Sequence, residues 1–229
     1  MTALPGPLAD PLPDPLPDLY PPFGLRITAG PLTLRPLRDE DLPEYAALMH
    51  RPIFADMDSD QVFPWYDVDP DERVARSVQF QWQLRSKVGP TDWNLSFGIF
   101  HQEQLIGMQD LGASHFAVRR VVGSDSWLTL DEQGKGHGTL MRQAVLVLAF
   151  DHLGAQRAET SAVVGNAASY GVSRSCGYRE DGQLVVEENG RAKTLQRFSL
   201  TPERFRGPDV AVEVEGLTGA LRGLLGAGG

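Results

Sequence analysis

The chain has 229 residues, 41% of them hydrophobic, which predicts one domain with tails. Its formal net charge of −9, without a basic run of five residues, disfavours a nucleic-acid partner, because that affinity depends on neutralising phosphates. No apolar run approaches the roughly 18 residues of a membrane span, no secretion signal precedes the domain, and the lone Cys176 excludes an internal disulfide, so we expect a cytoplasmic protein without a membrane partner.

Residues 1–24 are predicted to form a Pro-rich N-terminal arm. Eight prolines fall within residues 1–22, and Asp-Pro-Leu-Pro occurs twice, a composition that favours extended polyproline II structure. Two interpretations stay open: a disordered or surface-draped leader, or a strap across the second subunit of a homodimer.

The main domain is predicted over residues 25–205 and begins with a strand at Leu32–Arg35 and a helix at Asp39–Met49. An irregular, aromatic-rich stretch follows at Pro52–Trp65. A second helix should start after Asp69, where a capping acid precedes Pro70, and end near Lys87.

Two alternating segments, Trp93–Phe100 and Gln104–Leu111, predict a hairpin. Residues 112–123 are expected to continue the second strand with a bulge. A further strand leads to Trp127–Leu130, immediately before a glycine-rich turn.

The glycine turn, residues 133–138, reads Gln133-Gly134-Lys135-Gly136-His137-Gly138, and an apolar helix is predicted after it from Thr139 to Leu153. Strand, glycine turn and helix together favour anion binding. The first turn of a helix has unpaired N–H groups and positive dipole potential, and glycines let successive amides converge on a phosphate.

Three known phosphate-binding motifs share features with this turn. The nucleoside triphosphate loop fails, because Thr129 stands where its first glycine is required and Gly136 where its hydroxyl is required. The dinucleotide fingerprint matches only two glycines and stays a weak alternative, with Glu159 in place of its ribose-binding acid. The third pattern, Gln/Arg-x-x-Gly-x-Gly/Ala, is met by Gln133, Gly136 and Gly138.

The remaining segments alternate between strand and helix. Gln156–Val163 predicts a strand, Asn166–Cys176 a helix that Gly177 ends, and Tyr178–Val186 with Arg191–Leu200 an antiparallel pair around a turn at Glu188-Asn189-Gly190. Residues 206–229 are predicted as a C-terminal extension with a short helix at Leu217–Leu225.

Four of these features occur in the order typical of one family. They are Trp127-Leu128, the glycine turn with Thr139, Asn166-Ala-Ala-Ser169 and Gly177-Tyr178. On them the chain resembles, over roughly residues 31–200, the GNAT superfamily of acyl-CoA-dependent N-acyltransferases and within it the RimJ/RimL-like branch. The resemblance implies an α/β (α+β) fold: a mixed, mostly antiparallel seven-stranded sheet with helices on both faces and a splayed central strand pair.

The resemblance also implies where coenzyme A binds. Backbone groups of Leu128 and Leu130 would pair with the pantetheine arm, amides of the glycine turn would hold the diphosphate, and Asn166 and Ser169 would reach the coenzyme from the next helix or simply cap that helix. The expected coenzyme-binding residues are Leu128, Thr129, Leu130, Gln133, Gly134, Lys135, Gly136, His137, Gly138, Thr139, Asn166 and Ser169. No metal is expected.

The catalytic residues are less constrained by pattern. Asp125 and Glu159 are the two candidate general bases, with His115 and Asp110 behind them. Where the family often has a tyrosine that protonates the leaving sulfur, this chain has Ser173; water, Ser173 or no acid at all are the alternatives. Phe63, Trp65 and Tyr66 are expected to line the acceptor pocket, or else to pack under their loop.

The predicted function is transfer of an acetyl group from acetyl-CoA to an amine by direct attack in a ternary complex. Succinyl-CoA is a second donor, for which Arg119 or Arg120 would bind the extra carboxylate. A non-catalytic acyl-CoA-binding module and a nicotinamide dehydrogenase are the rivals. The acceptor stays open between a protein N-terminus, a lysine and a small molecule.

Overall fold

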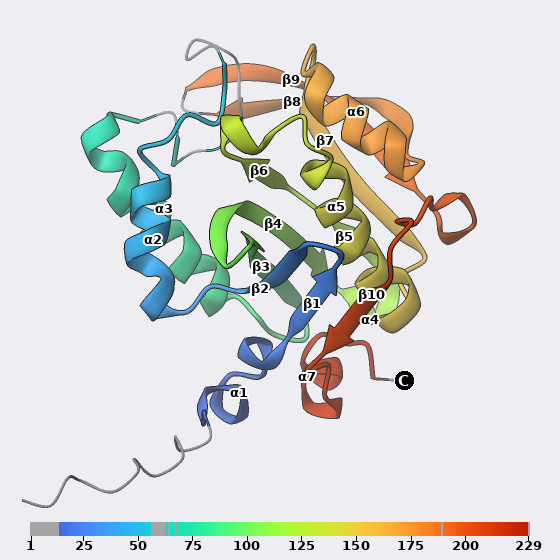
Figure 1. The fold of residues 1–229 in the computed structure, drawn as a ribbon. Helices are drawn as coiled ribbons and strands as arrows, with labels where there is room; N and C mark the ends of the chain where they lie inside the picture. The colour runs from blue at the N-terminus through green and yellow to red at the C-terminus, as the bar shows by residue number, and fades with distance from the viewer. Residues whose placement is uncertain (1–13, 56–62, 64, 67, 189, 229) are drawn as a thin grey trace, which may run out of the picture.

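The computed structural model describes residues 14–55, 63, 65–66, 68–188 and 190–228, and within them ten strands form one sheet in the order β10-β1-β2-β3-β4-β5-β7-β9-β8, with β6 paired to β4 (Figure 1). The strands are β1 (Arg26–Ala29), β2 (Leu32–Pro36), β3 (Asp92–His101), β4 (Gln104–Ser114), β5 (Val121–Gly123), β6 (Ser126–Leu128), β7 (Arg157–Val163), β8 (Arg179–Glu188), β9 (Arg191–Leu200) and β10 (Val212–Glu215). All pairs are antiparallel except β5 with β7. The predicted fold class is confirmed, whereas the predicted strand number is too low.

Two of the unexpected strands lie at one edge of the sheet. β1 and β10 have four residues each and pair along their whole length, from Arg26 with Glu215 to Ala29 with Val212. Strands this short carry too little alternation to be detected in a sequence. Residues 206–228 therefore extend the sheet, and Leu221 and Leu225 are buried in its core.

Helices cover both faces of the sheet, as predicted. Figure 1 shows α2 and α3 together at one side and α5 and α6 at the other. Two apolar clusters correspond to these faces, one between the sheet and α5, the other between the sheet and α2–α3. The α-helices are α1 (Leu16–Leu19), α2 (Leu42–Leu48), α3 (Pro70–Ser86), α4 (Phe116–Arg119), α5 (His137–Val147), α6 (Ala167–Cys176) and α7 (Gly219–Leu224).

Several helix boundaries follow from local chemistry. α3 begins where the Asp69 side chain accepts a hydrogen bond from the Asp71 amide, as its sequence predicts. α5 starts at His137, two residues before the predicted Thr139, because Gly136 takes a left-handed conformation and serves as its N-cap. A π-helical turn, Leu148–His152, extends it.

The segment 112–123 differs from the predicted bulged strand. β4 ends at Ser114, and the short helix α4 lies between His115 and Arg120, both in the left-handed conformation at φ 51°. Two such non-glycine residues are uncommon, so no simple pattern predicts this break.

The splay point is the place where the chain after β5 and the strand β7 part. β5 pairs with β7 as far as Gly123 and Glu159, and the Ser124 amide still donates to the Glu159 carbonyl at 3.1 Å. Beyond this, β6 pairs only with β4, and β7 only with β9. The predicted splayed pair is present.

Some predictions fall outside the described residues: most of the Pro-rich arm, residues 1–13, and Asn189 of the closing turn. Residues 14–24, the rest of the arm, form α1 and a 3-10 turn at Pro21–Gly24. Among the helices that the structure describes, none has the length and apolar character needed to cross a membrane. The homodimer stays a prediction.

Candidate active site

A cleft of about 920 Å³ opens where β6 and β7 separate. It reaches from the splay point to the glycine turn, and the loop after α2 closes one side. This is the size of pocket that holds a sizeable organic ligand. Its lining includes Ile53, Phe54, Phe63, Asp125, Ser126, Trp127, Leu128, Leu130, Gln133, Gly134, Gly136, Gly138, Thr139, Arg142, the stretch 160–169 and Val172.

At one end of the cleft, the glycine turn presents backbone rather than side chains. Gly134 and Gly136 have φ values of 72° and 87°, which L-residues rarely adopt, and no atom lies within 4 Å of a Cβ placed on either. No side chain caps α5. The amides of its first turn therefore face the cleft with no partner inside the helix, which is the arrangement that binds anions.

Gln133 ties the turn to the cleft walls. Its Nε2 donates to the Ile53 carbonyl at 2.8 Å and to the Leu128 carbonyl at 3.0 Å. The Leu130 amide donates to the Pro52 carbonyl at 2.8 Å. This amide is therefore already bonded, and the pairing of Leu130 backbone groups with a pantetheine arm stays a prediction.

The Leu128 amide has a different setting. Thr129 donates to the Ile106 carbonyl at 3.0 Å and Asp125 accepts from the Asp110 amide at 2.7 Å, so the odd-numbered residues of this segment bond to β4. By the alternation of an antiparallel ladder, the N–H of Leu128 points away from β4 and toward the cleft.

Three of the predicted coenzyme-binding residues have side chains that lie outside the cleft. Thr129 is fully buried against β4. Lys135 is half exposed, and its Nζ contacts the Glu132 carboxylate at 3.1 Å. The His137 ring is buried behind the turn beside Glu132, where burial lowers its pKa. None of the three lines the cleft, because the turn directs its side chains away from the backbone surface that faces it.

A buried arginine holds the splay point together. Arg142 of α5 is 3% exposed, and its guanidinium donates to the Gln109 Oε1 at 3.3 Å, the Ser126 Oγ at 3.0 Å and the Thr160 Oγ1 at 3.3 Å. These acceptors belong to β4, β6 and β7. One cation thus connects the two separating strands through neutral partners only, and it lines the cleft.

Two aspartates are neighbours across adjacent segments near the splay point: the Asp110 amide donates to the Asp125 carbonyl at 2.7 Å. Asp125 lines the cleft, and part of its side chain is exposed there. The surrounding protein atoms remove water from around the carboxylate and so raise its pKa, whereas the positive charge of Arg142 lowers it. For Asp110, burial and the neighbouring Asp125 charge raise the pKa to about 7. The cleft therefore has one carboxylate with a raised pKa, Asp125, and next to it, outside the lining, a second carboxylate that titrates near neutral pH.

The other predicted catalytic residues are placed less favourably. Glu159 does not line the cleft, and its carboxylate pairs with Arg157 at 2.8 Å. Ser173 is buried, and its hydroxyl has no hydrogen-bond partner. Neither reaches the space between β6 and β7, so the structure does not support these two as catalytic residues. His115, Arg119 and Arg120 lie at α4, also outside the lining.

The predicted acceptor residues divide in the same way. Phe63 lines the cleft together with Phe54. Trp65 and Tyr66 are buried instead, Trp65 with its ring 5.4 Å from that of Trp127. They support the wall rather than form it, because the loop turns both rings into the α2–α3 cluster.

Asn166 and Ser169 do line the cleft at its α6 side. The Asn166 Oδ1 accepts a hydrogen bond from the Ser169 amide at 3.0 Å, so the capping alternative holds for this oxygen. The Asn166 side-chain nitrogen and the Ser169 hydroxyl have no partner among the described residues. Both are therefore free to contact a ligand.

Arg142 and Gln109 were not predicted as functional residues. Their hydrogen-bond partners come from four separate elements, so no spacing between residues in the sequence predicts them. One signal was present: Arg142 is the one charged side chain in the apolar helix His137–Val147, where a charge is costly unless it is bonded.

A family model described as "Acetyltransferase (GNAT) domain" matches residues 31–179. Among solved structures, the fold is similar to Mycobacterium smegmatis RimJ in complex with CoA-disulfide, with 23% identity, a TM-score of 0.64 and coverage of 79% of this chain and 86% of that one. It is also similar to RimL, a ribosomal L7/L12 alpha-N-protein acetyltransferase in complex with coenzyme A, with 19% identity, a TM-score of 0.60 and coverage of 76% and 95%. A third is the microcin C7 self-immunity acetyltransferase MccE in complex with acetyl-CoA and AMP, with 18% identity, a TM-score of 0.60 and coverage of 75% and 93%. At these identities the structures indicate a shared fold.

Proposed function

Because the chain belongs to the GNAT acetyltransferase family, we propose that it transfers an acetyl group from acetyl-CoA directly to an amine, in a ternary complex and without a covalent enzyme intermediate. One observation carries the proposal. A single cleft joins the unpaired amides at the N-terminus of α5 to the Asp125 carboxylate, and it passes between strands that the fold holds apart.

The glycine turn is the proposed diphosphate site. Its amides are unpaired, the α5 dipole adds positive potential, and positive φ values at Gly134 and Gly136 leave the approach free of side chains. An extended pantetheine arm would then follow the open edge of the splayed strands, as a peptide adds to a sheet edge.

The Leu128 amide is the proposed donor to the thioester oxygen. A backbone N–H fixed in a strand needs no reorganisation when negative charge develops on that oxygen. Pairing of β6 with β4 fixes the Trp127–Leu128 peptide, which carries this N–H. Since a thiol with a pKa of about 8.5 leaves readily as a thiolate, the absence of a favourably placed acid at Ser173 is no obstacle.

Asp125 is the proposed general base. The attacking amine must lose a proton, and Asp125 is the carboxylate that lines the cleft. Its raised pKa makes it a stronger base than an ordinary aspartate. Asp110 contributes indirectly, because its retained proton limits the negative charge beside Asp125.

A protein N-terminal amine is the proposed acceptor class. Such amines have a pKa of about 8, against about 10.4 for lysine, so less proton removal is required at neutral pH. The similar RimL structure carries the name of an alpha-N-protein acetyltransferase. The net charge of −9 also favours a cationic acceptor.

Thiol release from acetyl-CoA tests the proposal, with pairs of peptides that differ only in a free or an N-terminally blocked α-amine. We expect release with the free peptide and none with its blocked partner, even if the blocked peptide contains lysine. Release with lysine or small amines alone would refute the acceptor class. Binding of acetyl-CoA without release by any amine would leave an acyl-CoA-binding module.

Succinyl-CoA is a second candidate donor, favoured by Arg142 rather than by the predicted Arg119 or Arg120. Arg142 lines the cleft and its hydrogen-bond acceptors are neutral oxygen atoms, so it can bind an acyl carboxylate in addition to its electrostatic effect on Asp125. If succinyl-CoA is used, Arg142→Met should lower kcat/KM for succinyl-CoA much more than for acetyl-CoA. An equal loss for both donors would assign Arg142 to the splay point alone.

A further inference from the structure

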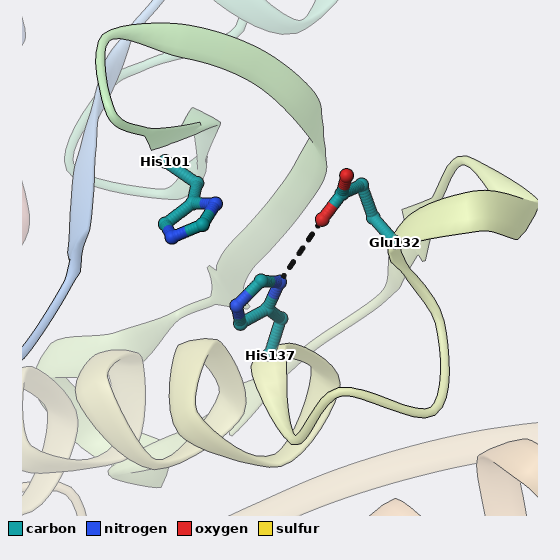
Figure 2. A group of neighbouring side chains, drawn as sticks. All are labelled: His101, Glu132 and His137. Atoms are coloured by element: carbon teal, nitrogen blue, oxygen red, sulfur yellow. Dashed lines mark ion pairs between the residues drawn. The ribbon is translucent and has the colours of Figure 1, made fainter.

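Three side chains that could bind a metal converge behind the glycine turn. His101 ends β3, Glu132 lies in the 3-10 turn Leu130–Glu132, and His137 is the first residue of α5. Their ligand atoms all lie within 4.8 Å of one another. Figure 2 shows the two rings and the carboxylate directed from three separate segments into one space.

Two buried atoms of this cluster have no hydrogen-bond partner among the described residues: the Nδ1 of His137, a residue that is 8% exposed, and the Oε2 of Glu132. When His137 is protonated, the two form an ion pair. Buried polar atoms are rarely left in this state. The two atoms are 3.4 Å apart. Two ligands that are each about 2.1 Å from a tetrahedral zinc ion also lie about 3.4 Å apart.

We propose that His101, Glu132 and His137 form a binding site for a divalent transition-metal ion of the Zn²⁺ type. Two imidazoles and one carboxylate are a set that such ions accept, with water in the fourth position. Mg²⁺ and Ca²⁺ are disfavoured because they prefer oxygen ligands throughout. His101 is far from the other two in sequence, so the cluster has no recognisable spacing, which is why no metal was expected from the sequence.

The site is distinct from the cleft, since none of its three residues lines it. Glu132 immediately precedes the glycine turn and His137 lies near its end, so a bound ion would fix the turn at both places. The ion would also neutralise Glu132, whose carboxylate contacts the Lys135 Nζ at 3.1 Å, and so release a cation near the diphosphate site. This consequence rests on the proposed function: Zn²⁺ should strengthen acyl-CoA binding.

Zn²⁺ titration of the chelator-stripped full chain against a chromophoric chelator tests the site itself. We expect one ion per chain, at least about tenfold weaker binding in His101→Gln and Glu132→Gln, and unchanged binding in His50→Gln, a control for an exposed histidine elsewhere. His101 ends a hairpin strand and is only partly buried, so its variant should fold, as a thermal melt would verify. No stoichiometric ion, or wild-type affinity in both site variants, would overturn the proposal.

A second titration separates the metal site from the proposed function. Acetyl-CoA is the probe, because the thiol of free coenzyme A would itself bind zinc. Zn²⁺ should tighten acetyl-CoA binding severalfold in the wild type and leave it unchanged in His101→Gln. Equal affinities with and without Zn²⁺ would refute the coupling. If acetyl-CoA does not bind under either condition, the proposed function fails, while the first titration still decides the metal site.

Discussion

The glycine turn and the splay point lie at the two ends of one cleft and are built in opposite ways. The turn presents backbone amides, and its side chains at Lys135 and His137 point elsewhere. The splay point presents side chains, with Asp125 exposed in the cleft and Arg142 bonded to three strands. Side-chain substitutions should therefore matter most at the splay point, and conformational substitutions at the turn.

The largest effect is expected for Asp125→Asn. Loss of the proposed base should lower kcat by about 100-fold or more, because general-base catalysis contributes about 10²- to 10⁴-fold. Affinity for acetyl-CoA should change little, since the turn is untouched. Glu159→Gln is the matched control and should retain kcat, because Glu159 does not line the cleft. Steady-state kinetics measure both; similar losses in the two variants would remove Asp125 from its role.

Gly136→Ala tests the turn as a backbone device. At φ 87° an alanine is strained by about 1–2 kcal/mol, although nothing blocks its Cβ. We expect about tenfold weaker acetyl-CoA binding by calorimetry as the amides shift. Lys135→Ala should weaken binding less, because exposed ion pairs contribute about 0.2–1 kcal/mol. If the lysine variant loses more affinity than the glycine variant, the turn binds through its side chain.

The variant Asp110→Asn tests the raised pKa of Asp110 through the pH dependence of stability. The raised pKa of about 7 means that folded Asp110 keeps its proton while the unfolded chain, near 4, has lost it. Wild-type stability should therefore fall as pH rises from about 4 to 7 and stay reduced above 7. The variant should be more stable than the wild type at pH 8 and similar at pH 4 in urea unfolding. A difference that does not depend on pH would contradict the raised pKa.

Ser173→Ala should have the smallest effect. Its hydroxyl is buried without a partner and outside the cleft, so its removal should leave kcat unchanged and stability unchanged or slightly higher. Activity and thermal melts measure this directly. A large fall in kcat would place Ser173 in the reaction as a proton donor.

The contrast between the two regions also explains what the sequence could predict. The turn is encoded by consecutive residues, so its position and its role as the start of a helix could be read from Gln133 to Thr139. Asp125 could be predicted as a candidate base because it precedes Trp127 by two residues in the segment predicted to enter the turn. The same local logic predicted the hairpin and α3, whereas the splayed pair was implied by the family resemblance.

The arrangements that were missed depend on residues far apart in the chain. Arg142 gains its role only when three strands bring acceptors to it. Trp65 and Tyr66 look like pocket aromatics until the α2–α3 cluster covers them. The edge pair of β1 with β10 joins segments from the two ends of the chain, and His101 reaches His137 only through the fold.

A crystal structure of the chain with acetyl-CoA tests the central claim most directly. We expect diphosphate oxygens within hydrogen-bond distance of amides between Gly134 and Thr139, and the thioester between β6 and β7 beside the Leu128 amide. A coenzyme bound elsewhere, or one that leaves the N-terminus of α5 without contact, would contradict it.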